Sequence, residues 1–370
     1  MKPMCNIFRI FPIISQLLIA TFFGVTFSSC GGVYEYIDPC EDPTITPEPA
    51  KKVKVPVNIH FQSDFYVWHH SYDPLIGKIE ETYPDAKIYP GYPGTTERYS
   101  NIASEGVMDV EVKMYKGSNT NNMVGSGNYS ITLTGVDYDH DFDMELEAGT
   151  TYTLALWSHL RENEKDDPFY DPSDFNKVEI VKSKYQGNND YRDGFSATIT
   201  IVAPDEDTDK PVEILMTRPM GKFEFVTVDL SEFLTRETKR RSLPTRASAE
   251  EYIVVVSFPY YYPNSYSVLD DRLENSISGM SFKTGITVTG ASQASLGFEY
   301  VMLNDIADGG VQARVDIYDP NMEHVAGSTT LTIPMRRDTH TLLTGNFLSE
   351  LNEGGIGIDP DFDGEFNIPI

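Results

Sequence analysis

Residues 52–61 read KVKVPVNIHF, with an apolar side chain at every second position from Val53 to Phe61. Successive side chains of a β-strand point to opposite faces, so this alternation is typical of a strand that buries one face. The pattern returns along most of the chain, and turns rich in Gly, Asn and Asp separate the repeats. It predicts further strands at residues 110–114, 152–156, 197–201, 212–216, 223–228, 252–256, 286–288, 311–318, 329–333 and 366–370.

Helical patterns are few. Residues 231–241 are the best candidate, with Ser231 as the predicted N-cap and Glu232 in the first turn. Residues 347–351 are a second, shorter candidate. Many short strands separated by regular turns predict an all-β fold built from sandwiches, with few short helices.

The composition is that of a folded, acidic protein. Hydrophobic residues make up 40% of the 370 residues and aromatic residues 12%, which is enough to build cores. There are 29 basic and 56 acidic residues, for a net charge of −27. Such a chain repels phosphates, so nucleic-acid binding is excluded. Three cysteines are too few for a disulfide framework.

The N-terminus carries a targeting signal. Lys2 and Arg9 precede an apolar run at residues 10–27, which ends at Ser28-Ser29-Cys30. We interpret residues 1–29 as a lipoprotein signal peptide, Cys30 as the lipidated residue, and residues 30–50 as a flexible tether. An uncleaved membrane helix or ordinary secretion is the alternative. Several acyl chains on one cysteine would hold the protein at the cell outer membrane, with the membrane as a partner.

Two stretches are candidate domain boundaries. Residues 203–211 (APDEDTDKP) are acidic and flanked by proline, and residues 236–249 are strongly basic. Strand counting favours the first stretch because it leaves roughly seven strands on each side, as a sandwich needs. We therefore predict an N-terminal β-sandwich at residues 51–205 and a C-terminal β-sandwich at residues 206–370.

No catalytic motif appears in the sequence, so we predict a protein that is not an enzyme. The seven histidines, including His69-His70, lack metal-ligand spacing, and we predict no metal and no cofactor. Residues 359–364 (DPDFDG) match the opening of a calcium loop, but Ile370 stands where the bidentate Glu should be. Asp137, Asp139, Asp141 and Asp143 alternate, which is typical of a solvated face or a surface cation site.

Two further groups allow two interpretations each. Tyr260, Tyr261 and Tyr262 lie between two prolines and could stack on sugar rings, or pack in the core at a strand end. The second group could be a trypsin-like processing site, or cations that suit a helix C-terminus. Its members are Arg236, Lys239, Arg240, Arg241 and Arg246.

Several segments together resemble the fimbrillin-type lipoproteins of Bacteroidales, the anchor and accessory subunits of type V pili. The first element is the lipid cysteine with its short tether. In the final segment, Asp338 stands where the family usually has Asn. The remaining segments are residues 110–117 (VEVKMYKG), 146–157 (LEAGTTYTLALW), 191–195 (YRDGF), 216–223 (MTRPMGKF) and 333–348 (IPMRRDTHTLLTGNFL).

The resemblance implies two tandem transthyretin-like (Greek-key) sandwiches without enzymatic chemistry, which assemble with fimbrial subunits by strand donation. Stalk subunits of the family lose their first strand by cleavage after an arginine. The first arginine after the signal here is Arg98, beyond the strand, which fits an anchor or capping subunit that keeps it.

The resulting hypothesis is an outer-membrane-anchored, surface-exposed subunit that acts in fimbria assembly and cell adhesion. The last ten residues would contribute a donated strand through Phe362, Phe366, Ile368 and Ile370, or this strand closes the C-terminal sandwich of its own chain. The alternative is a surface lipoprotein that binds glycans, with Tyr260, Tyr261, Tyr262 and Trp68 in a sugar site.

Overall fold

Alternating burial produces the strand that opens the fold. In β1 (Lys52–Phe61), Val53, Val55, Val57 and Ile59 are buried, and the residues between them are exposed or half-buried. The computed structural model describes residues 50–62, 64–73, 78–81, 98–100, 105–134, 139–166, 168–304 and 310–348. All of these lie in one compact unit that begins at Ala50.

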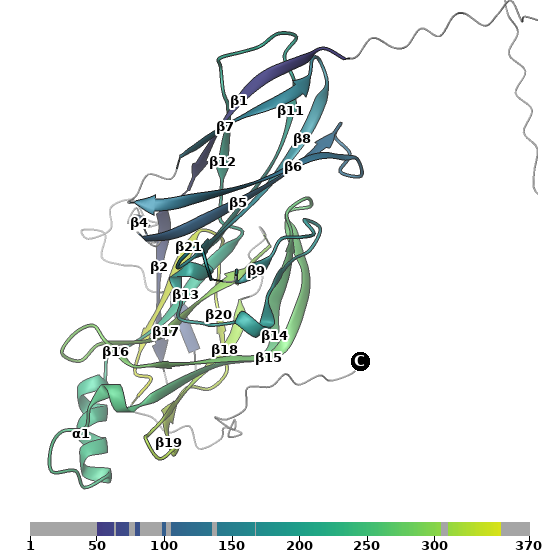
Figure 1. Ribbon diagram of the computed structural model, residues 1–370. Coiled ribbons are helices and arrows are strands. Elements are labelled where there is room, and N and C mark those ends of the chain that lie inside the picture. Colours follow the sequence, from purple (N-terminus) through teal and green to yellow (C-terminus); the bar gives the residue numbers. More distant parts are fainter. Residues whose placement is uncertain are drawn as a thin grey trace, which may run out of the picture. The chain divides into compact units, whose positions relative to one another are not determined.

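The first sandwich consists of two sheets, which Figure 1 shows in purple to teal. One sheet has the order β12-β1-β7 and the other the order β11-β8-β5-β6. Buried side chains of both sheets meet in one core, among them Ile59, Val110, Leu156 and Ile214. The bounds of the other strands are β5 (Glu105–Lys116), β6 (Met123–Thr134), β7 (His140–Glu147), β8 (Thr151–Arg161), β11 (Gly194–Val202) and β12 (Val212–Met216).

The second sandwich also consists of two sheets. One has the order β19-β18-β14-β10-β9, with β15 paired to β14 and β20 to β18. The other has the order β16-β17-β13-β21-β2-β3, with β4 paired to β2. The core between them holds Phe223, Phe258, Tyr300, Val315 and Leu343. The bounds are β2 (Asp64–Asp73), β3 (Lys78–Glu81), β4 (Arg98–Ser100), β9 (Tyr170–Asp171), β10 (Val178–Ile180), β13 (Met220–Thr227), β14 (Ile253–Ser267), β15 (Arg272–Gly285), β16 (Thr287–Val288), β17 (Ala294–Met302), β18 (Val311–Tyr318), β19 (His324–Gly327), β20 (Leu331–Ile333) and β21 (Thr339–Gly345).

The all-β prediction with sandwiches and few helices is confirmed. The sheets, however, do not follow the predicted division between residues 205 and 206. That division falls in the loop between β11 and β12, and both of these strands belong to the first sandwich. Conversely, β2, β3, β4, β9 and β10 precede the division and pair within the second sandwich. The chain therefore passes between the two sets of sheets several times.

The helix α1 (Leu230–Arg240) begins one residue before the predicted range 231–241, and its N-cap is Asp229 instead of Ser231. The Asp229 carboxylate accepts the hydroxyl of Thr227 and the N–H of Leu348, the latter at 3.2 Å. Phe233 and Leu234 bury one face of α1 in the second core. Short 3₁₀ turns are η1 (Lys182–Lys184), η2 (Asp190–Arg192) and η3 (Ala249–Glu251).

The second predicted helix is wrong for its described residues. Phe347 and Leu348 form a bend directly after β21, and residues 349–351 lie outside the described residues. Phe347 stacks on Tyr72 with 4.6 Å between ring centroids, and it also contacts Phe225. These contacts hold Phe347 in the second core at the position where a helical turn was expected.

Candidate functional site

β1 occupies the central position of its sheet. It pairs in parallel with β12, from Val57↔Val212 to Phe61↔Met216, and antiparallel with β7, from Lys52↔Glu147 to Ile59↔His140. Both edges of β1 are thus hydrogen-bonded, and its apolar face fills the core of the first sandwich. In a sandwich that lacked this strand, the same place would be an open groove with an exposed strip of core.

Side chains on the outward face of β1 form ion pairs with β7. Lys54 pairs with Asp143 at 2.7 Å, and Lys52 lies 3.8 Å from Glu145. Asp141 lies opposite Asn58 in the ladder. The alternating aspartates that suggested a cation site therefore face β1, and two of the described ones have cationic partners there. Asp137 lies outside the described residues.

His60 bridges the two neighbours of β1. Its Nδ1 lies 2.9 Å from the Asp139 carboxylate, next to β7, and its Nε2 lies 2.7 Å from Glu213 on β12. The hydrogen bonds to Glu213 and Asp139 raise the pKa of His60. Both contacts favour the charged form of the imidazole, and they tie both flanking strands to β1.

A buried ionic group lies where the chain passes from one sandwich to the other. Arg218 donates from Nε to both carboxylate oxygens of Asp193, at 2.9 and 2.8 Å. Its Nη1 donates to the carbonyl of Gln62 at 2.9 Å and to Asp338 at 3.0 Å. The Gln62 side-chain amide also donates to Asp338. We call Gln62, Asp193, Arg218 and Asp338 the crossover cluster.

Each member of the crossover cluster fixes a different segment. Gln62 separates β1 from β2, and Arg218 separates β12 from β13. Asp193 precedes β11, and Asp338 precedes β21. Asp338 has a positive φ of 54°, and its N–H donates to the carbonyl of Met220 at 2.9 Å. The cluster therefore locks four strand junctions together.

A second set of buried charges lies beside this cluster along the chain. Arg192 pairs with Glu299, and both side chains are fully buried. The Tyr185 hydroxyl donates to Glu299 at 2.8 Å. Lys222 and the Tyr300 hydroxyl each donate to Asp190 at 2.8 Å.

Burial raises the pKa of three buried carboxyl groups, those of Asp338, Asp193 and Glu299. It raises the pKa of Asp338 to about 6, with the nearby charge of Asp193 adding to the effect and Arg218 opposing it. Burial also raises the pKa of Asp193 and Glu299 against the pull of their arginines. Buried charges persist when they are paired and hydrogen-bonded, so this arrangement suits holding segments in place.

The sequence carried a partial signal for these residues. Arg192, Asp193, Arg218 and Lys222 lie in two of the segments that resemble fimbrillin-type proteins. Gln62, Asp190 and Glu299 were missed as site residues. Glu299 is an acid within the otherwise apolar and small-residue strand β17, and such an isolated charge points to a buried partner.

The three consecutive tyrosines differ in their exposure to solvent. Tyr260 and Tyr261 are 55% and 75% exposed, whereas Tyr262 is fully buried. The Tyr262 hydroxyl donates to the carbonyl of Tyr300 at 3.0 Å. A register shift between Phe258 and Tyr261 explains why two consecutive tyrosines reach the solvent. Trp68 is half-buried on β2, and the Arg336 guanidinium lies 4.1 Å from its ring.

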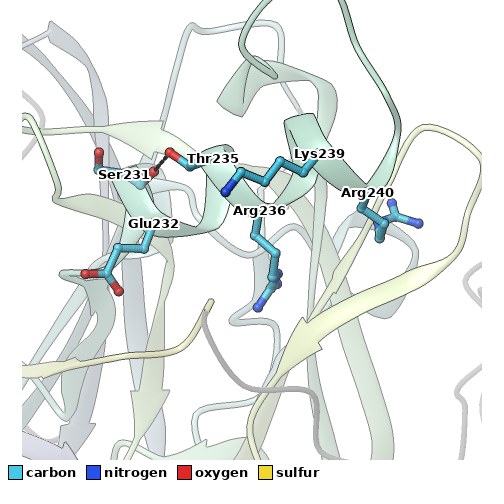
Figure 2. Close-up of a pocket in the computed structure, with 6 residues that line it drawn as sticks. All are labelled: Ser231, Glu232, Thr235, Arg236, Lys239 and Arg240. Atoms are coloured by element: carbon cyan, nitrogen blue, oxygen red, sulfur yellow. Dashed lines mark hydrogen bonds between the residues drawn. The ribbon is translucent and has the colours of Figure 1, made fainter.

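A shallow cationic groove runs along α1. Figure 2 shows Ser231, Thr235 and Lys239 along the helix, with the Thr235 hydroxyl donating to the Ser231 carbonyl at 2.8 Å. Arg236 donates to the carbonyl of Leu348 at 2.9 Å, and Arg240 contacts Glu237, Asp319 and Glu323. Arg241 pairs with Glu251 at 2.7 Å. These contacts favour the interpretation of the basic residues as a helix end over a processing site.

Several predicted sites lie outside the described residues. They are Cys30, residues 1–29, the tether up to residue 49, the acidic loop at 359–364, and the strand-donation candidates Phe362, Phe366, Ile368 and Ile370. Within the described ranges, no group of three or more His, Cys, Asp or Glu residues is placed to hold a metal ion. No helix in the same part of the chain is long and apolar enough to cross a membrane.

The structure is thus that of an all-β protein with two sandwiches, whose strand junctions are joined by a buried ionic cluster. The chain belongs to a family of unknown function, DUF6562, whose model matches residues 108–370. No curated protein matches the sequence significantly.

Three solved structures illustrate what the chain resembles. A candidate adhesin from Bacteroides thetaiotaomicron is 11% identical with a TM-score of 0.40, over 78% of this chain and 81% of that one. The tip fimbrial protein Mfa3 from Porphyromonas gingivalis is 8% identical with a TM-score of 0.36, over 76% and 82%. A fimbrial assembly protein from Parabacteroides distasonis is 8% identical with a TM-score of 0.37, over 81% and 94%.

Proposed function

We propose that this protein is a lipid-anchored structural subunit of a surface fimbria, which acts as an anchor or accessory subunit in assembly and cell adhesion. The position of β1 carries the proposal. β1 is hydrogen-bonded on both edges and follows directly on the predicted tether from Cys30. The first sandwich is therefore complete within the chain, and it needs no strand from another subunit.

This completeness suits one end of a fibre. A stalk subunit both accepts and donates a strand, whereas a subunit with a filled groove can only donate one or be bound on its surface. In our proposal the lipid on Cys30 holds the protein at the outer membrane, and residues 361–370 offer a strand to the neighbouring fimbrial subunit. The protein has no catalytic role in this proposal.

The test is a pair of matched cysteine variants, Cys30→Ser and Cys40→Ser, expressed as the full chain in a fimbriated host. We expect Cys30→Ser to move the protein from the membrane fraction to the soluble fraction, and Cys40→Ser to leave it bound. Fimbrial subunits should co-purify with the wild type from outer membranes. Membrane retention of Cys30→Ser with an unprocessed N-terminus would overturn the anchor, and an absence of fimbrial subunits would overturn the assembly role.

Glycan binding is the second candidate, and the exposed pair Tyr260 and Tyr261 favours it. Adjacent exposed aromatic rings offer faces on which sugars can stack. The double variant Tyr260→Ala with Tyr261→Ala should abolish binding on a glycan array if this function holds. Val288→Ala, at another exposed apolar side chain, is the control. Equal binding by the wild type and the double variant would reject the candidate.

A further inference from the structure

We propose that β2, β21 and β13 form a mechanical clamp that resists tension between the two ends of the chain. β21 lies between β2 and β13 and runs parallel to both. Seven residue pairs join β2 to β21, from Tyr66↔Thr339 to Tyr72↔Gly345. The ladder from β21 to β13 runs from Lys222↔His340 to Thr227↔Gly345.

The direction of these strands decides how a load acts on them. A pull on the N-terminal side enters β2 at its first residue, and a pull on the C-terminal side enters β21 at its last residue. Because the strands are parallel, the two forces slide β2 and β21 along each other. The evenly spaced hydrogen bonds of a parallel ladder then share the load and must break together. Strands pulled apart from one end would instead lose these bonds one at a time.

The N-terminal load reaches β2 without unfolding the first sandwich. β1 is already extended, at roughly 3.3 Å per residue, so it transmits tension with little lengthening. β1 ends at Phe61 and β2 begins at Asp64. Between them, Arg218 holds the carbonyl of Gln62 at 2.9 Å, and the Gln62 amide holds Asp338 at the start of β21.

The far end of β21 is fixed as well. The Gly345 carbonyl accepts the N–H of Val228 at 3.1 Å. The Leu348 N–H donates to Asp229, and the Leu348 carbonyl accepts from Arg236 at 2.9 Å. Both ends of the ladder are thus pinned, which prevents fraying under load. This property belongs to the chain itself and goes beyond the proposed function.

Single-molecule pulling in two directions tests the clamp. The full chain carries Cys5→Ser, Cys30→Ser and Cys40→Ser, with handles at its N-terminus and beyond Ile370. In the second direction, the C-terminal handle is moved to a cysteine introduced by Arg336→Cys, at an exposed position shortly before β21 begins at Thr339. This geometry peels β2 from β21, and we expect a several-fold lower unfolding force. Equal forces in the two directions would overturn the proposal.

A covalent lock provides the second measurement. His69 and Leu342 are opposite each other in the ladder, so His69→Cys with Leu342→Cys places two thiols at disulfide distance. With end-to-end handles, we expect the main rupture to vanish when the pair is oxidised and to return on reduction. An unchanged rupture in the oxidised variant would show that the load does not cross this pair. Equal denaturant midpoints for the reduced variants and the parent confirm that only the loading differs.

Discussion

Arg218 serves two buried carboxylates at once. Its Nε donates to both carboxylate oxygens of Asp193, and its Nη1 donates to Asp338 at 3.0 Å. Two carboxylates that share one cation raise each other's cost of ionisation, and burial adds to it. Burial raises the pKa of Asp338 to about 6, above its ordinary value of 3.8.

We predict that Asp338→Asn stabilises the protein at neutral pH. A carboxyl whose pKa is higher in the folded state stabilises the fold when it is protonated. This contribution is present below about pH 4 and is lost as the pH rises through about 6. Asn does not titrate, accepts from Arg218, and tolerates the positive φ. The free energy of unfolding should rise by about 1–2 kcal/mol at pH 7 and change little at pH 4.

Denaturant titrations at both pH values check this prediction. The matched control is Asp271→Asn, because Asp271 also has a positive φ of 53° and an arginine partner, Arg337 at 2.6 Å. Its side chain is largely exposed, so its replacement should change stability by about 1 kcal/mol or less. An Asp338→Asn variant with the pH profile of the wild type would contradict the assignment.

Single residues were only partly predictable from the sequence. Alternation placed Val53, Val55, Val57 and Ile59 in the core correctly because strand periodicity is local. The partners of buried charges are set by the tertiary fold, so the pair Arg192–Glu299 could not be found from spacing. A bulge escapes periodicity too, and for that reason the tyrosine triplet was taken as one unit.

At the scale of single elements, β1 is expected to be indispensable to the first sandwich. Val57 is buried between β12 and β7, so Val57→Ala leaves a cavity in this core and should lower the free energy of unfolding by about 2 kcal/mol. Lys52→Ala is the control on the outer face, where an exposed ion pair contributes about 0–1 kcal/mol. Equal losses in the two variants would show that β1 does not fill the core as described.

The C-terminal segment is expected to act outside its own sandwich. Described strands that end at β21 already form both sheets of the second sandwich. Deletion of residues 361–370 should therefore leave the melting temperature nearly unchanged while fimbria attachment fails. Asn367→Ser, which changes a polar position of the same segment, is the control. Unfolding or aggregation of the truncated protein would show that the segment completes its own core.

Elements were more predictable than their partners. Most predicted strands have counterparts, and the predicted strands at residues 212–216 and 311–318 match β12 and β18 at both ends. Alternation shows which face of a strand is buried but not which sheet the strand joins. The parallel pairing of β1 with β12 and of β2 with β21 therefore lay beyond the sequence pattern. The domain boundary was predicted from proline and charge, and these features carry no information on how often the chain passes from one sandwich to the other.

For the whole molecule, we expect purified protein to contain no stoichiometric zinc or iron. The histidines on described strands have other contacts: His60 binds two carboxylates, and the ring of His70 packs against Trp68. Elemental analysis after dialysis tests this, and a chelator should leave the melting temperature unchanged. Metal that survives chelation at one ion per chain would contradict the prediction.

The β2–β21 ladder also has a consequence for how the protein is made. Residue 66 finds its partner at residue 339, so the second sandwich cannot close until the ribosome has synthesised almost the whole chain. Pairings between distant segments form slowly because the intervening loop must first be ordered. The strands of the second sandwich therefore remain unpaired with β21 for most of the synthesis. A chain that has not closed is the form that a secretion channel can thread, so late closure would suit the export that the proposed lipid anchor requires.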